Sequence, residues 1–317
     1  MVTWKSYAGE KMLKTYNIIE GRLSGAEDRT GAVHIYTNPD DNEISYLINE
    51  LKIDEHTCKS ALDPDELGRL EFEPNHIAVI VKCPKRYTAA DNFLFKVSSL
   101  GLFLFTDRLI IIMKENADIF DNRIFQKLNS VSDVFLKTIF RCVQHFEEHL
   151  NVIHKVSSEL EMEINQALTN RDLLYMFSLE KSLVYYLKAI SSNSRVIEKV
   201  KSNSGKISLS QEQNEFLEDM IIEADQCTEE ANIYLQVISN MMDAWVSMVS
   251  NNLNIRMKTL TILSICIMLP TFIVSLFSMN VRLPIPQHET IVSFWFISAL
   301  AALSVMILVI FWWRKKW

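Results

Sequence analysis

The pattern of apolar and polar positions changes near residue 116. Before it, short runs of branched and aromatic residues alternate with turn formers, which predicts β-strands. The predicted strands are 13–19, 32–36, 77–81, 94–97, 102–105 and 109–113. Helices are expected at 43–51 and 64–70, each entered from an Asp or Asn. Interleaved strands and helices predict a mixed α/β domain over residues 1–116.

From residue 117 onward the apolar positions recur at helical spacing. Residues 119–204 contain neither proline nor glycine. This stretch predicts a short helix and then two long antiparallel helices that meet near residues 168–171, together spanning 117–207. A further helix is expected from residue 208 and has no breaker before Pro270. Some 60 residues of helix extend about 90 Å. A stalk over 208–257 would therefore continue directly into the chain's first long apolar run.

Two long apolar runs, 258–277 and 290–313, stand near the end of the sequence. Neither contains an acidic residue, and Lys258 at the edge of the first is their only basic residue. About 20 apolar residues cross a bilayer as a helix. The sequence therefore predicts membrane-spanning helices at 258–279 and 290–313, joined by a loop at 280–289. The resulting fold class is an α+β membrane protein with an N-terminal α/β domain, a helical stalk and two C-terminal spans.

Basic residues flank the pair of spans and orient it. Arg256 and Lys258 precede the first span, and the tail 314–317 after the second carries three basic residues. The loop holds only Arg282 and Glu289 as charged residues. The positive-inside rule places both termini in the cytoplasm and the loop outside. Tryptophans at the span ends fit interfacial anchors.

One face of the first span is polar. Steps of three and four residues meet only polar residues and methionines: Asn254, Met257, Thr261, Ser264, Met268, Thr271 and Ser275. The stripe continues back through Ser250 and Ser247 to Asp243. Packing between membrane helices explains a short patch of Ser and Thr. Ten positions that end in an acid favour a wet pore wall. Two helices cannot enclose a pore, so several copies of this helix would have to surround an axis.

Charge and composition narrow the class of partner. The stretch from Met257 onward takes five of the 32 basic and one of the 39 acidic residues, which leaves a net charge of −11 on the first 256 residues. This balance argues against nucleic-acid binding and suits a domain that meets cations, although ordinary solubility also explains it. Five widely spaced cysteines without a CxxC motif indicate reduced thiols and no thiolate zinc site.

Enzyme motifs are missing from the sequence. Glycine is scarce, and no hydrolase, P-loop or dinucleotide motif occurs. His145 and His149 lie four residues apart on one predicted helix, a spacing that can bind a metal. A solvated helix face is the preferred interpretation, because histidine is ordinarily exposed or half-buried. We expect no enzymatic activity.

The first span closes on the tripeptide Ser278-Met279-Asn280, after Leu260-Thr261 and Pro270-Thr271. These residues resemble the CorA family of divalent-cation channels, whose first span ends in Gly-Met-Asn and is followed closely by a second. The resemblance is strong over the two spans and weaker before residue 245. It implies a homopentamer in the inner (plasma) membrane, with lipid around it. The first span, Leu260 included, would line the pore. A ring of Asn280 at the outer mouth would bind hydrated Mg²⁺.

The sequence departs from the family pattern in two places. Ser278 stands at the motif glycine, and the loop lacks the usual acidic segment and carries Arg282. Acidic residues near a pore gather cations by their field, so these changes bear on ion selectivity. Two alternatives stay open: a relative that carries Zn²⁺, Co²⁺ or Ni²⁺, and a membrane-anchored adaptor or sensor that conducts nothing.

The expected path has a chemistry suited to a hydrated cation. Mg²⁺ gives up water reluctantly, and amide oxygens of Asn280 can accept hydrogen bonds from its water shell. Hydroxyls would follow below, and apolar rings at Met268 and Leu260 can close a pore by dewetting. Asp243 would lie at the inner mouth. By the family resemblance, Asp219 falls where a regulatory Mg²⁺ bridges neighbouring subunits; otherwise it is a surface charge beside Glu218.

Overall fold

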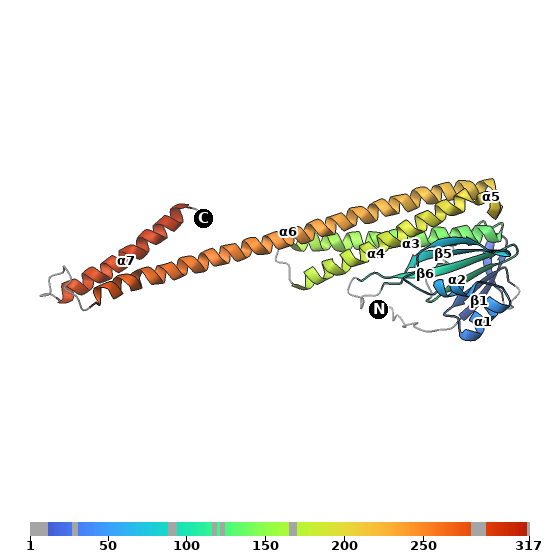
Figure 1. Ribbon diagram of the computed structural model, residues 1–317. Helices are drawn as coiled ribbons and strands as arrows, with labels where there is room; N and C mark the ends of the chain where they lie inside the picture. Colours follow the sequence, from blue (N-terminus) through green and yellow to red (C-terminus); the bar gives the residue numbers. More distant parts are fainter. Residues whose placement is uncertain are drawn as a thin grey trace. The chain divides into compact units, whose positions relative to one another are not determined.

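The computed structural model describes residues 12–26, 31–87, 94–115, 119–120, 124–164, 170–279 and 290–315 (Figure 1). Two compact units divide the chain, Met1–Met242 and Asp243–Trp317, and each is described by itself. The predicted outer-mouth residue Asn280 and the predicted loop 280–289 lie outside the described residues.

A mixed sheet forms the first part of unit 1. Its strands are ordered β2-β1-β3-β7-β6-β5-β4. Their bounds are β1 Met12–Ile19, β2 Arg22–Ala26, β3 Val33–Thr37, β4 Arg69–Phe72, β5 His76–Pro84, β6 Val97–Phe105 and β7 Leu109–Met113. The β3–β7 pair is parallel, and the other neighbours pair antiparallel.

The central strands are buried on both faces, which explains their continuous apolar runs. In β5, Val79 and Val81 face one hydrophobic core and Ala78 and Ile80 face the other. The smaller core lies under two short helices, α1 (Asp41–Asn49) and α2 (Glu55–Ser60). Asp40 and Glu43 form a capping box at the start of α1, so the helix predicted at 43–51 begins two residues earlier than expected.

The larger core lies between the sheet and a set of longer helices. These are α3 (Val131–Ile164), α4 (Asn170–Ser202), the short α5 (Ser204–Ile207) and α6 (Gln211–Phe277). Phe140 of α3 meets Phe216 of α6 with ring centroids 5.2 Å apart. The two long helices were predicted. The short helix expected before them is wrong, because residues 124–130 form turns, bends and an isolated bridge.

The helix predicted at 64–70 is also wrong. Residues 64–68 are turns and irregular backbone, and β4 begins at Arg69. Tertiary contacts take the backbone groups that a helix would use: the Gly68 N–H donates to Ser192 Oγ at 2.8 Å and the Pro64 carbonyl accepts from Lys82 Nζ at 2.9 Å. A Cβ on Gly68 would meet Ile80 O at 3.0 Å. Likewise, 94–96 are irregular, and only Val97 belongs to a strand, as the first residue of β6.

Unit 2 contains the C-terminal part of α6 and the helix α7 (Thr290–Lys315). Their most apolar stretches have mean hydropathies of 2.4 and 2.6 and no buried residues. In the described part of the chain, these two helices are long and apolar enough to cross a membrane. Pro270 lies inside α6, so the Cys266 carbonyl loses its usual intrahelical donor there. The two predicted long apolar helices are confirmed.

Candidate functional site

The predicted pore stripe lies on the open face of α6 in unit 2. From residue 261 to 277, the partly buried positions of α6 share one face, and they are Ile262, Cys266, Leu269, Pro270, Ile273 and Phe277. The stripe residues in the same stretch, Thr261, Ser264, Met268, Thr271 and Ser275, are all exposed. At about 100° per residue, the two sets lie on opposite sides of the helix. The polar positions therefore lie on the face opposite the partly buried one, and the apolar Leu263, Ile267 and Phe272 beside them are exposed too.

The hydroxyls on the open face share one geometry. Thr261 Oγ1 donates to the Met257 carbonyl at 2.8 Å, and Ser264 Oγ donates to the Leu260 carbonyl at 2.9 Å. Thr271 Oγ1 donates to the Ile267 carbonyl at 2.7 Å. Each proton is thus committed to the helix backbone, and the oxygen lone pairs remain as acceptors. Three hydroxyl oxygens that face outward as acceptors suit a cation or the water shell around one.

Large apolar side chains interrupt the hydroxyl row. Met257, Leu260 and Met268 are 61%, 59% and 67% exposed. Methionine is unbranched and flexible, so it can fill or open a narrow space. Nearer the N-terminal end of α6, Asn254 and Asp243 are exposed. At the other end of α6, the Ser278 N–H donates to the Val274 and Ser275 carbonyls and closes the last turn, and the exposed Met279 is the last residue described there.

The sequence reasoning missed that the part of α6 before Arg256 carries charge of one sign only. Residues 211–255 contain nine acidic side chains and no Lys or Arg. A simple count of charges along the segment would have found it. Asp219 is exposed in this segment, while its neighbour Glu218 pairs with Lys201 at 2.6 Å. A long acidic helix surface concentrates cations near it.

Acids of α3 and α6 repel one another in unit 1. Burial, followed by the charges of Glu223 and Glu230, raises the pKa of Glu147. A cation nearby would relieve this repulsion. Yet no group of three or more His, Cys, Asp or Glu side chains in the described residues is arranged to hold a metal ion. A regulatory ion at Asp219 would therefore need ligands from beyond the described residues of one chain.

The interpretation of His145 and His149 as a solvated face is wrong. His145 is 9% exposed and its Nδ1 lies 3.6 Å from Cys83 Sγ. His149 Nδ1 lies 2.6 Å from the Tyr186 hydroxyl. Burial, followed by the charge of His145, lowers the pKa of His149 to about 4. Phe95 and Tyr186 cover this face of α3, which the periodicity of α3 alone does not reveal.

Comparisons with known proteins agree with this architecture. The family described as CorA-like Mg²⁺ transporter protein matches residues 34–316. The chain is 23% identical over 292 residues to the cobalt/magnesium transport protein CorA of Methanocaldococcus jannaschii, covering 88% of this chain and 89% of that protein. The corresponding protein of Thermotoga maritima is 22% identical over 272 residues, covering 81% of this chain and 74% of that protein.

A solved structure extends the likeness to the fold. The complete structure of the CorA magnesium transporter from Methanocaldococcus jannaschii superimposes with a TM-score of 0.81 at 20% identity, and covers 98% of this chain and 100% of that one. The match includes the sheet unit, the long helices and both apolar helices. From the extent of the family match, and with the fold in agreement, the chain belongs to the family of CorA-like Mg²⁺ transporter proteins.

Proposed function

We propose that this protein carries Mg²⁺ into the cell through a pore lined by α6. The observation that carries the proposal is the open polar face, where the hydroxyls of Thr261, Ser264 and Thr271 donate to the helix backbone and keep their oxygens as acceptors. Such a face has no use in a simple anchor, because lipid disfavours exposed polar groups. Membership of a transporter family agrees with the expectation that the chain is not an enzyme.

The pore requires several copies of the chain around one axis. One chain supplies a single helix with this face, so the wall is incomplete without partners. We propose a homopentamer in the inner (plasma) membrane, with both termini in the cytoplasm. The membrane potential would then drive cations inward, at about 2.3 kcal/mol per elementary charge and 100 mV.

At the outer mouth we propose that a ring of Asn280 binds the hydrated ion. Amide oxygens bind a water shell more weakly than carboxylates would, and conduction requires release as well as binding. Cytoplasmic Mg²⁺ would close the channel by bridging subunits at Asp219. Such closure requires only that the ion bind the closed state better than the open one.

The alternative within transport is another divalent cation. Both curated relatives are named cobalt/magnesium transport proteins. This chain carries Ser278 at the motif glycine and Arg282 in the loop, which favours keeping Co²⁺, Ni²⁺ and Zn²⁺ among the candidates. The third reading, an adaptor or sensor that does not conduct, predicts membrane insertion without any ion flux.

Ion uptake into proteoliposomes tests all three readings. The wild-type protein is expected to take up Mg²⁺, and Asn280→Ala is expected to abolish uptake with assembly intact. Ser278→Gly serves as the matched control and should be tolerated. Uptake of Co²⁺, Ni²⁺ or Zn²⁺ but not Mg²⁺ would select the second reading. No uptake of any of these ions by correctly inserted protein would select the adaptor.

A further inference from the structure

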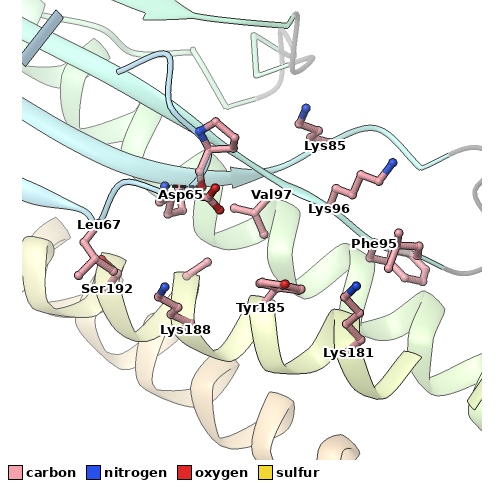
Figure 2. Close-up of a pocket in the computed structure, with 14 residues that line it drawn as sticks. Asp65, Leu67, Lys85, Phe95, Lys96, Val97, Lys181, Tyr185, Lys188 and Ser192 are labelled. Carbon is pink, nitrogen blue, oxygen red and sulfur yellow. Dashed lines mark hydrogen bonds between the residues drawn. The ribbon is translucent and has the colours of Figure 1, made fainter. Parts of the chain in front are cut away.

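Unit 1 contains a lysine-rich cavity that the proposed ion path does not use. It has a volume of about 310 Å³ and lies between α4 and the neighbouring ends of β5 and β6 (Figure 2). Its charged lining consists of one acid, Asp65, and the lysines Lys82, Lys85, Lys96, Lys181 and Lys188. This local excess of positive charge occurs in a chain whose net charge is −7. A positively charged cavity attracts anions even when the protein as a whole is negatively charged.

The α4 wall of the cavity combines two cations with an aromatic ring. Lys181, Tyr185 and Lys188 are spaced i, i+4, i+7 and therefore share one face of the helix. Figure 2 shows Tyr185 lying between the two lysines. The Tyr185 side chain is 48% exposed. Neither lysine has a hydrogen bond or an ion pair with any residue that the structure describes. Both ammonium groups are therefore available to an anion.

Lys82 supplies a buried cation from the strand wall. The residue is 4% exposed, and its Nζ donates to the Pro64 carbonyl at 2.9 Å and to Ser99 Oγ at 2.7 Å. Both acceptors are uncharged. Burial lowers the pKa of Lys82 to about 8, against the charges of nearby acids, of which Asp63 acts most strongly. Lys82 adds positive charge near the cavity, and its ammonium is already held by these two acceptors.

The walls are held together independently of any ligand. The Asn193 side chain of α4 accepts from the Lys82 N–H at 2.7 Å and donates to the Lys82 carbonyl at 2.8 Å. It thereby provides hydrogen-bond partners for the backbone of β5 where β4 no longer pairs with it. One further lysine already has a partner, because Lys85 pairs with Glu115 at 2.7 Å. The cavity is therefore preformed, with Lys181 and Lys188 as its main anion-binding groups.

We propose that this cavity binds a nucleoside polyphosphate. Lysine ammonium groups bind phosphate oxygens as point charges, and the α4 wall presents two of them, Lys181 and Lys188. The exposed Tyr185 ring offers a stacking surface for a base. The volume lies at the small end of the range for ligand pockets, which suits a mononucleotide. Mg²⁺ competes with lysines for the same phosphate oxygens, so the cavity should prefer the Mg²⁺-free form. The assignment does not depend on the proposed transport.

Calorimetric titration of the full-length protein in detergent with ATP tests the assignment. Binding is expected in EDTA and is expected to weaken when excess Mg²⁺ is present. The double variant Lys181→Gln/Lys188→Gln should lose about tenfold or more in affinity, because it removes two charge-assisted contacts. Both positions are exposed, so folding should survive. Lys199→Gln, an exposed lysine of the same helix that does not line the cavity, should bind as the wild type does.

Smaller probes separate the parts of the ligand. Tripolyphosphate is expected to bind more weakly than ATP, and Tyr185→Leu should remove this difference while tripolyphosphate affinity is unchanged. Equal affinity of the wild type for tripolyphosphate and ATP would overturn the nucleotide assignment. No binding of ATP, or equal losses in Lys181→Gln/Lys188→Gln and Lys199→Gln, would overturn the site itself. None of these outcomes depends on ion uptake, so they are distinguishable from failure of the transport proposal.

Discussion

At the scale of single residues, two threonines of α6 allow the proposed pore-lining face of the helix to be told apart from its packed face. Thr261 and Thr259 each donate their hydroxyl to the carbonyl four residues earlier, at 2.8 and 2.9 Å. They lie two residues apart and hence about 200° apart around the helix. Thr261 belongs to the open polar face, whereas Thr259 lies on the side that carries the partly buried positions of the following turns.

Thr261→Val is therefore expected to slow Mg²⁺ uptake and Thr259→Val to leave it nearly unchanged. The substitution keeps the shape and removes one acceptor. An acceptor worth about 1 kcal/mol at one point of the path slows passage about fivefold. Uptake rates at equal protein content measure the difference. Equal rates for the two variants would contradict the assignment of the lining face.

His149 makes a prediction about stability rather than transport. Its folded pKa of about 4 lies below the ordinary value of 6.5 because of burial and, second, His145. Its contribution to stability is complete above pH 6.5, where both states are neutral. As the pH falls from about 6.5 to about 4, the unfolded chain takes up a proton that the folded chain does not, and stability falls by up to about 3 kcal/mol.

His149→Phe should flatten this part of the pH dependence. Phenylalanine retains a ring beside Phe95 but cannot be protonated. The variant should also be less stable at pH 7, because the Tyr186 hydroxyl loses its 2.6 Å partner. Urea unfolding of unit 1, followed in the full-length protein from pH 4 to pH 8, measures both effects. A slope unchanged by the substitution would assign the pH dependence to other groups.

At the scale of elements, Asn193 connects α4 to the sheet. Its amide takes both backbone groups of Lys82, which lies on β5 beyond the reach of β4. Asn193→Leu would leave a buried N–H and a buried carbonyl without partners and is expected to cost about 2–4 kcal/mol. Ser194→Ala is the control, since Ser194 Oγ donates only to its own helix at the Ile190 carbonyl. Urea midpoints for the two variants measure the contrast, and similar small shifts would contradict it.

For the whole molecule, assembly is the first test. The open face of α6 has no partner in one described chain, and a pore needs several copies. Light scattering in mild detergent is expected to give a homopentamer. A monodisperse monomer or dimer would end the pore proposal.

Gating is the second test at this scale, and it separates two acids of α6. Both Asp219 and Asp243 are exposed. Asp219→Asn is expected to move closure to higher internal Mg²⁺, because it weakens the proposed bridge in the closed state. Asp243→Asn, at the proposed inner mouth, should lower the current at an unchanged set point. Current against internal Mg²⁺ measures both. Identical shifts would refute the division of labour, and no shift for Asp219→Asn would place the sensor on other acids.

The sequence by itself determined the features that depend on periodicity and length. The two apolar helices, the polar stripe from Asp243 to Ser275 and the long helices of unit 1 all follow from spacing, because each repeats over many turns. Most of the strands were also predictable, since their apolar runs are continuous where both sheet faces are buried. The outer-mouth residue Asn280 lies outside the described residues and stays a prediction.

Only the tertiary structure decided the features that depend on contacts distant in sequence. Residues 64–68 avoid a helix because Ser192 and Lys82 take the backbone groups of Gly68 and Pro64. His145 is buried and His149 half-buried because the sheet and α4 cover that face of α3. The lysine cavity likewise brings together residues from 64 to 192. Local propensity contributes only tenths of a kcal/mol per residue, so a few buried hydrogen bonds and one packed face override it.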